Sequence, residues 1–192
     1  MILVQFIKKP TEIIRDLEKY ESLILPIAFL SNFFSVLYQI TSREWNYEIN
    51  SSSLFALAVV IAPIIGFILI YLGSYVLKRV GELFGGEATI LEIKTVLAWS
   101  YLPSIIAGFL WVWAYFIFKE DLMITAKGKP QNSFIINLFW MIHFALSVWS
   151  IMLYFKLLAY VQKFSMLKSI VSTIIAIFIS ATFLSLLAVF IK

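Results

Sequence analysis

Few side chains in this sequence could carry out chemistry. His143 is the only histidine and there is no cysteine, which excludes a thiolate site, a Cys nucleophile and a zinc site built on paired histidines. No aspartate lies inside a long apolar run, and the pair Gly85 and Gly86 lacks the Lys-Ser/Thr that follows in a Walker-type phosphate loop. We therefore expect no enzyme activity, no cofactor and no metal site. His143 alone could carry a proton or contact a ligand.

Polar side chains recur at helical spacing within two apolar runs. One face carries Ala28, Ser31, Asn32, Ser35 and Gln39, and the other carries His143, Ser147, Ser150 and Tyr154. An amide or imidazole at an apolar depth needs a hydrogen-bond partner, so both faces should point into the protein. We expect hydrogen bonds between helices. The alternative is a polar path for a solute, an ion or a lipid head group.

The amino-acid composition indicates which environment surrounds these apolar runs. Of 192 residues, 62% are hydrophobic and 14% are charged, and the mean hydropathy is +0.96. Soluble domains are about 45–50% apolar and about 25% charged, so this excess must face lipid. The pI near 9.2 does not indicate nucleic acid, because the charges form no basic stripe with interleaved aromatics. The expected partner is the lipid bilayer.

Five apolar segments reach the length of about 20 residues that a membrane-spanning helix needs. They run over residues 23–40, 54–77, 96–118, 134–155 and 170–191. Before them, Pro10 and Thr11 precede a short amphipathic stretch that would lie in the interface plane. The sequence thus predicts an all-α, polytopic membrane protein with five transmembrane helices and a short N-terminal amphipathic interfacial helix. We divide it into an N-terminal segment, 1–22, and a membrane domain, 23–192.

Lys and Arg predict the orientation of the spans. Ten of the fifteen lie on the side of the N-terminus and of the 78–94 connection, and five lie on the opposite side. Since positive residues accumulate in cytoplasmic loops, the N-terminus should be cytoplasmic and the C-terminus outside. The protein should therefore be a multi-pass protein of a cell membrane.

The stretch GELFGGEATILEIK, residues 81–94, should close one helix and open the next. Lys78 and Glu82 can pair across one helical turn. Gly85 and Gly86 supply the backbone freedom of a helix C-terminus, and we predict that replacing both by Ala costs about 1 kcal/mol or more. Thr89 and Glu92 have the spacing of a capping box. The stretch reads as a cytoplasmic hairpin.

The next span contains Pro103, which should kink its helix. Small residues recur at intervals of four or seven positions on three spans, and such spacing on one helix face lets helix backbones approach closely. These stripes are Ala58, Ala62, Gly66 and Gly73, then Ser100, Ser104 and Gly108, then Ser172, Ala176 and Ser180. They predict helix packing, and one of them could form a dimer face.

A span ending in YVLKRVGELFGG, a short acidic link and then TVLAWSYLPSIIAGFLW resembles the Yip domain family of Ypt/Rab-interacting proteins. The matching positions are Gly85, Gly86, Tyr101 and Pro103. The resemblance implies five spans, a cytoplasmic N-terminus and, in eukaryotic members, a role in vesicle traffic with Rab GTPases. Since only about 20 residues precede the first span here, whereas those members carry a long N-terminal region, Rab binding is not carried over. The likeness is to short prokaryotic members, which implies a prokaryotic cell membrane.

We therefore expect a non-enzymatic membrane protein that organises membrane or protein partners, such as another membrane protein or further copies of itself. The alternative is a small transporter or channel for an ion, solute or lipid that uses the polar faces of the first and fourth spans. The candidate functional or structural positions are Asn32, Gln39, Gly85, Gly86, Glu87, Glu92, Tyr101, Pro103 and His143.

Overall fold

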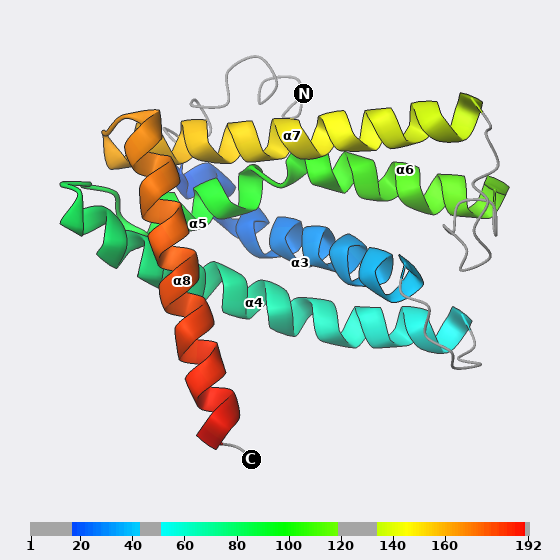
Figure 1. Cartoon of the computed structure of the whole chain (residues 1–192), viewed down its shortest axis with the longest axis horizontal. Coiled ribbons are helices and arrows are strands. Elements are labelled where there is room, and N and C mark those ends of the chain that lie inside the picture. Colours follow the sequence, from blue (N-terminus) through cyan, green and yellow to red (C-terminus); the bar gives the residue numbers. More distant parts are fainter. Residues whose placement is uncertain (1–16, 43–50, 119–133, 191–192) are drawn as a thin grey trace.

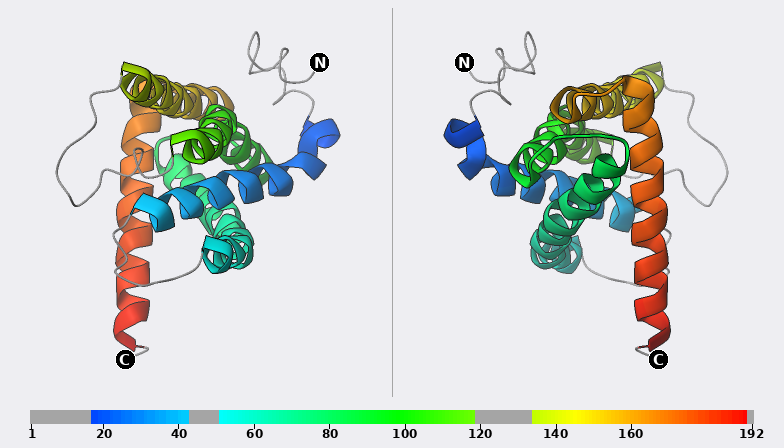
Figure 2. Two further views of the ribbon diagram at one scale, coloured as in Figure 1. Left: turned by 90° about the vertical axis from the view of Figure 1, so that its right-hand side faces the viewer. Right: turned by 90° about the vertical axis from the view of Figure 1, so that its left-hand side faces the viewer.

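The computed structural model describes residues 17–42, 51–118 and 134–190, and all its elements are α-helices. In chain order they are α3 (Leu17–Ser42), α4 (Ser51–Leu83), α5 (Ile90–Trp99), α6 (Leu102–Phe118), α7 (Phe134–Gln162) and α8 (Met166–Phe190) (Figure 1). Helices α4, α5–α6 and α7 run back and forth along the long axis of the molecule, and α3 crosses them obliquely (Figure 2). Helix α8 starts beside the end of α7 and crosses steeply over α4 (Figures 1 and 2).

Four described helical stretches are long and apolar enough to cross a membrane, and a shorter apolar stretch, Glu21–Val36, lies within α3. The four are Ala58–Leu83, Ile90–Trp113, Asn137–Gln162 and Met166–Phe183. The prediction of an all-α, polytopic membrane protein with five apolar helical segments is confirmed. Helix α3 runs unbroken from Leu17, so residue 22, where we placed a boundary, lies inside it. The predicted interfacial helix lies mainly before Leu17, outside the described residues.

The small residues of α4 bring it close to α3. Ala58 and Ala62 are fully buried, and a Cβ atom at Gly66 would lie only 3.2 Å from the backbone oxygen of Ala28. Gly108 of α6 faces the ring of Phe34 in the same way, leaving no room for a larger side chain. Ala58, Ala62, Gly66 and Gly108 therefore serve the packing that their spacing predicts.

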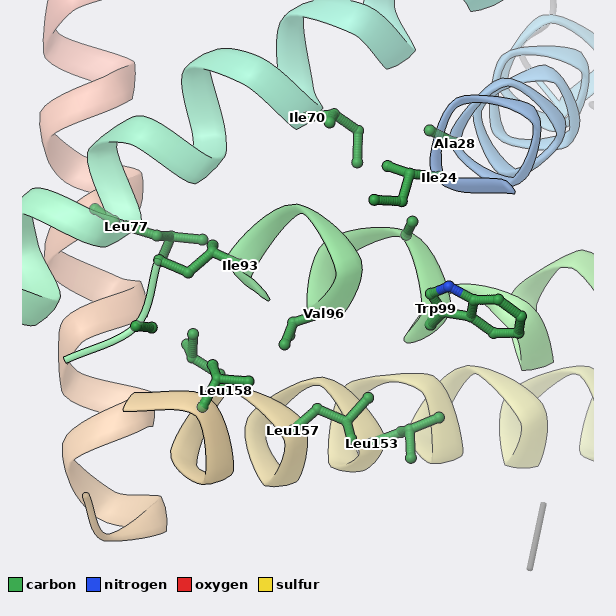
Figure 3. Packing of buried hydrophobic residues seen from close by; sticks show 14 of the residues in the cluster. Ile24, Ala28, Ile70, Leu77, Ile93, Val96, Trp99, Leu153, Leu157 and Leu158 are labelled. Atoms are coloured by element: carbon green, nitrogen blue, oxygen red, sulfur yellow. The ribbon is translucent and has the colours of Figure 1, made fainter. Parts of the chain in front are cut away.

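The hydrophobic core surrounds α5. Ile93, Val96 and Trp99 of α5 face Ile24 and Ala28 of α3, Ile70 and Leu77 of α4, and Leu153, Leu157 and Leu158 of α7 (Figure 3). Five of the ten residues of α5 are buried, whereas many large apolar side chains of α4, α7 and α8 are exposed. Helix α5 is therefore the central element, and its neighbours turn most of their apolar surface to the lipid.

Candidate functional site

Helix α4 ends in a glycine turn. Gly85 has φ +81°, the Gly85 N–H donates to the Glu82 oxygen at 3.1 Å, and the Gly86 N–H donates to the Gly81 oxygen at 2.9 Å. These two bonds form a Schellman motif, which satisfies carbonyls that a helix end leaves without partners. The left-handed residue predicted for this turn is Gly85. Gly86 has a different role: a Cβ atom there would collide with the side chain of Gln162, so the constraint is steric.

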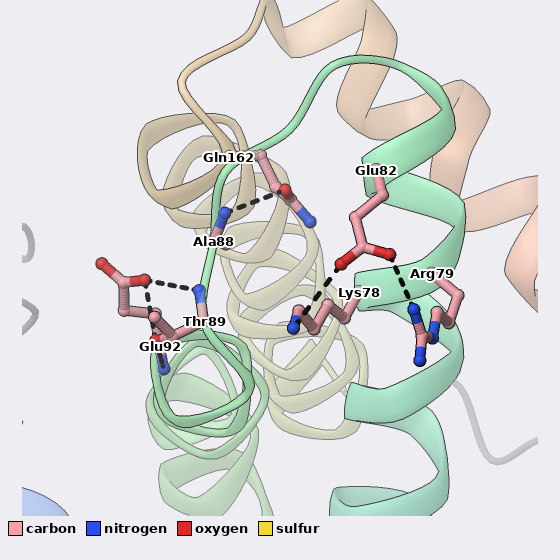
Figure 4. A network of polar contacts seen from close by, with 7 residues as sticks. All are labelled: Lys78, Arg79, Glu82, Ala88, Thr89, Glu92 and Gln162. Carbon is pink, nitrogen blue, oxygen red and sulfur yellow. Dashed lines mark hydrogen bonds and ion pairs between the residues drawn. The ribbon is translucent and has the colours of Figure 1, made fainter.

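Helix α5 begins with the capping box that its sequence predicts. The Glu92 N–H donates to Thr89 Oγ1 at 3.2 Å, and the Thr89 N–H donates to Glu92 Oε2 at 2.7 Å (Figure 4). The exchange satisfies two backbone donors at the start of the helix. The turn between α4 and α5 is thus closed by local hydrogen bonds at both ends.

Gln162, the last residue of α7, fills the inside of this turn. Its side chain is 1% exposed, and its Oε1 accepts a hydrogen bond from the Ala88 N–H at 3.4 Å (Figure 4). A Cβ atom at Gly81 or at Gly86 would collide with the same amide group. Two glycines therefore make room for one buried amide. The sequence analysis did not single out Gln162, because no local pattern connects it to residues 81–88.

Helix α7 also ends in a Schellman motif. Lys163 has φ +55°, its N–H donates to the Tyr160 oxygen at 3.3 Å, and the Phe164 N–H donates to the Ala159 oxygen at 3.1 Å. This backbone brings Lys163 Nζ to 2.7 Å from Glu87 Oε2. The hydrogen bond to Lys163 and its charge lower the pKa of Glu87, and Glu87 raises the pKa of Lys163. Both groups are therefore charged at neutral pH.

We call this region the polar end: it is the end of the bundle where α4 and α7 end and where α5 and α8 begin. Glu82 there accepts from Lys78 at 3.5 Å, as predicted, and from Arg79 at 3.3 Å (Figure 4). Lys94 Nζ lies 3.7 Å from the ring centre of Tyr71, a cation–π contact between α5 and α4. The polar end thus combines exposed charges with a backbone held by several elements.

The kink predicted at Pro103 is a break between α5 and α6. Helix α5 ends at Trp99, Ser100 and Tyr101 form a turn, and α6 begins at Leu102. The Ser104 N–H belongs to the first turn of α6, where donors have no partner within the helix. It donates to Ser150 Oγ of α7 at 3.1 Å, and the two serine hydroxyls lie 2.7 Å apart. Ser150 therefore satisfies the backbone at the break.

The polar faces of α3 and α7 meet at a small cavity of about 170 Å³. Its lining includes Ser31 of α3, Ser104 of α6, and His143 and Ser147 of α7. In the described part of the chain, α6 packs against both α3 and α7 and lies between them at this point. The contacts of His143 lie on α6 and on its own helix: its ring interacts with the Ala107 backbone of α6, and Ser147 Oγ donates to the His143 carbonyl at 2.9 Å.

Asn32, the candidate position on α3 whose side chain the structure describes, does not line this cavity. Asn32 Nδ2 donates to the Ala28 oxygen of its own helix at 2.7 Å. Gln39 lies in α3, but its side chain is outside the described set. The candidate positions therefore form three groups: Gly85, Gly86, Glu87 and Glu92 at the polar end, Tyr101 and Pro103 at the break, and His143 at the cavity.

Within the described ranges, no group of three or more His, Cys, Asp or Glu side chains could hold a metal ion. The arrangement defines a polytopic α-helical membrane protein with a fixed polar end and a broken central helix. The Yip1 domain model matches residues 4–189, so the chain belongs to the Yip1 domain family. This confirms the family that the glycine turn and the Tyr-Leu-Pro element resemble. No curated protein and no solved structure matches the chain.

Proposed function

We propose that this Yip1 domain protein acts without catalysis, as a membrane scaffold that holds a partner at its polar end. The observation that carries the proposal is the ion pair between Glu87 and Lys163, which joins two capped helix ends across 76 residues. Both side chains remain well exposed, at 66% and 71%. Exposed ion pairs add little stability, whereas fixed charges at a surface set the specificity and rate of association.

Rigidity supports the same proposal. A binding surface is more selective when its groups are held on rigid elements by contacts behind them. Gln162 and the two Schellman motifs hold the residues beneath Glu87 and Lys163 in this way. The polar end presents acids and bases side by side, which fits a partner surface of mixed charge. The partner is another membrane protein or a second copy of this chain.

The location of the polar end follows from the distribution of positive residues. Lys78, Arg79, Lys94, Lys163 and Lys168 all lie there, on the side that carries ten of the fifteen Lys and Arg residues of the chain. We therefore place the polar end in the cytoplasm. We also propose that the N-terminus is cytoplasmic, that the C-terminus is outside and that the membrane is a prokaryotic cell membrane.

A charge exchange tests the scaffold function. The double variant Glu87→Lys/Lys163→Glu keeps an ion pair and the net charge but reverses the local charges. A photoreactive amino acid at position 79, where the side chain is 61% exposed, reports partner contact in native membranes. The same group at Phe144 of α7, 71% exposed in the apolar region, is the matched control for lipid contact.

We expect a discrete protein adduct from position 79 and none from position 144. In the exchanged variant the adduct should be lost while the thermal stability is retained. An adduct with the mass of two chains would identify a second copy as the partner. If the exchanged variant forms the same adduct in the same yield, the charges do not recognise the partner and the proposal is wrong.

The small cavity beside His143 favours one alternative, a transporter or channel. At about 30 Å³ for each water molecule, its size would admit a few waters or one small solute. Flux into liposomes above that of protein-free vesicles would support this alternative. If a His143→Gln variant folds but loses a pH-dependent flux, His143 is the residue that carries the proton. We expect no flux from the parent protein or from the variant.

A further inference from the structure

A second cavity, of about 630 Å³, lies beside the break between α5 and α6. Its walls come from α4, α7 and α8 as well as from the break itself. Half of its lining residues carry a hydroxyl group, and none of them is charged. Its volume falls within the range of about 300–1,000 Å³ that is usual for ligand sites.

The mouth of this cavity faces hydrocarbon. Leu69 of α4, Ile151 of α7 and Ile177 of α8 line it and are all strongly exposed, at 49%, 55% and 62%. All three lie within stretches that are long and apolar enough to span a membrane. A ligand would therefore enter sideways from the bilayer.

The hydroxyl groups of the cavity are only partly paired. Ser104 bonds to Ser150, and Tyr154 Oη lies 3.1 Å from Thr173 Oγ1. In the described part of the chain, the hydroxyls of Tyr101 and Ser180 have no hydrogen-bond partner. Because hydrocarbon offers none either, a hydroxyl left unpaired at this depth is costly.

The uncharged, hydroxyl-bearing lining indicates the chemical class of the ligand. Lipid tails are as apolar as the cavity wall, so apolar contact alone favours no molecule over the surrounding lipid. Hydrogen bonds must then provide the selectivity. A charged head group would meet no opposite charge in this lining and would be expensive to bury there. We infer that the cavity binds a neutral glycerolipid with a free hydroxyl group, of the diacylglycerol class.

This site goes beyond the proposed scaffold function and does not depend on it. The charge exchange at Glu87 and Lys163 lies outside the cavity lining and should leave lipid binding unchanged. Failure of the scaffold proposal and failure of the lipid site are therefore separate results.

The test uses the purified full chain in nanodiscs with a photoactivatable diacylglycerol. Labelling should map to the α7 and α8 segments that line the cavity, and unlabelled diacylglycerol should compete. Phosphatidylglycerol, which is anionic, and a hydrocarbon without hydroxyl groups should not compete. Equal competition by all three would show non-selective lipid contact and would overturn the inference, as would preference for the anionic lipid.

Hydroxyl variants test the hydrogen bonds. Tyr101→Phe and Ser180→Ala should each lower labelling about three-fold, the effect of one typical hydrogen bond between membrane residues. Ser185→Ala is the matched control, since Ser185 lies on the same helix, is exposed and is not part of the lining. Equal labelling of the Ser180 and Ser185 variants would overturn the inference.

A filling variant tests the cavity itself. A Cβ atom at Gly73 would have only Leu97 Cδ1 within 4 Å, at the ordinary contact distance of 3.7 Å, and a larger side chain there would extend into the cavity that Gly73 lines. Gly73→Leu should keep the thermal stability and abolish labelling. Labelling that persists in the folded Gly73→Leu variant would contradict the inference. If Gly73→Leu does not fold, the Tyr101→Phe and Ser180→Ala variants test the inference instead.

Discussion

The Gly86→Ala substitution probes the contact between the α4–α5 turn and the end of α7. The added Cβ atom would collide with the Gln162 amide and lie 3.0 Å from the Gly81 oxygen. The amide itself is buried and accepts from the Ala88 N–H, so it cannot move aside without losing that bond. Overpacking of this kind costs about 1–3 kcal/mol.

A double-mutant cycle separates this steric cost from backbone strain. Gln162→Ala alone should cost about 1–3 kcal/mol, because it leaves the Ala88 N–H unpaired. It also removes the group that the Gly86→Ala methyl would strike, so the double variant should be more stable than the sum by about 1–2 kcal/mol. Gly85→Ala is the control. It should cost about 1–2 kcal/mol through its left-handed φ and show no coupling to Gln162, since nothing lies within 4 Å of its Cβ position.

The measurement is the free energy of unfolding in a mixed-detergent titration, followed by circular dichroism. If Gly86→Ala and Gln162→Ala are additive within about 0.5 kcal/mol, the two residues do not compete for space and the reasoning is refuted. A coupling between Gly85→Ala and Gln162→Ala of the same size would also refute it, because strain in the turn would then explain both results.

Three further predictions concern other parts of the molecule. Because Lys163 lowers the pKa of Glu87, the pair stabilises the fold above the unfolded pKa of about 4.3, and this contribution is lost as the pH falls through the lower folded pKa. Melting curves of the parent and of Glu87→Gln should therefore differ by a small amount at pH 7 and converge as the pH falls through the lowered folded pKa of Glu87. Ser150→Ala should lower the free energy of unfolding by about 1 kcal/mol, since it removes the partner of an α6 backbone donor. Reporter fusions after Arg79 and after Lys192 should lie on opposite sides of the membrane, and finding both on one side would remove a span.

The local features of the fold could be predicted because a few neighbouring residues determine them. The capping box depends on Thr89 and Glu92 alone, and the Lys78–Glu82 pair depends on one helical turn. The break at Pro103 follows from a missing N–H and a ring that clashes with the preceding turn. The five apolar segments follow from bilayer thickness. Each of these signals lies within the element that it shapes.

The contacts between distant segments could not be predicted in this way. The Ala88–Gln162 bond joins residues 74 apart, and the Ser104–Ser150 bond joins residues 46 apart. Periodicity placed His143 on an inward face, but it could not show that α6 lies between α3 and α7. A helical face specifies which residues are buried, and the neighbouring helix specifies what they meet. That neighbour depends on the packing of the whole bundle.

Helix α7 links these distant contacts. The chain between α4 and α6 leaves regular helix twice, at the glycine turn and at the Pro103 break. Where such backbone lies near or within a bilayer, protein groups must satisfy its polar atoms because hydrocarbon cannot. Gln162 does so at the turn and Ser150 at the break, and both belong to α7. Their spacing of twelve residues corresponds to about 18 Å of helix, so one rigid element fixes both irregular sites. Gln162 and Ser150 of α7 therefore have a structural role: they accept hydrogen bonds from backbone N–H groups of the α4–α5 turn and of α6.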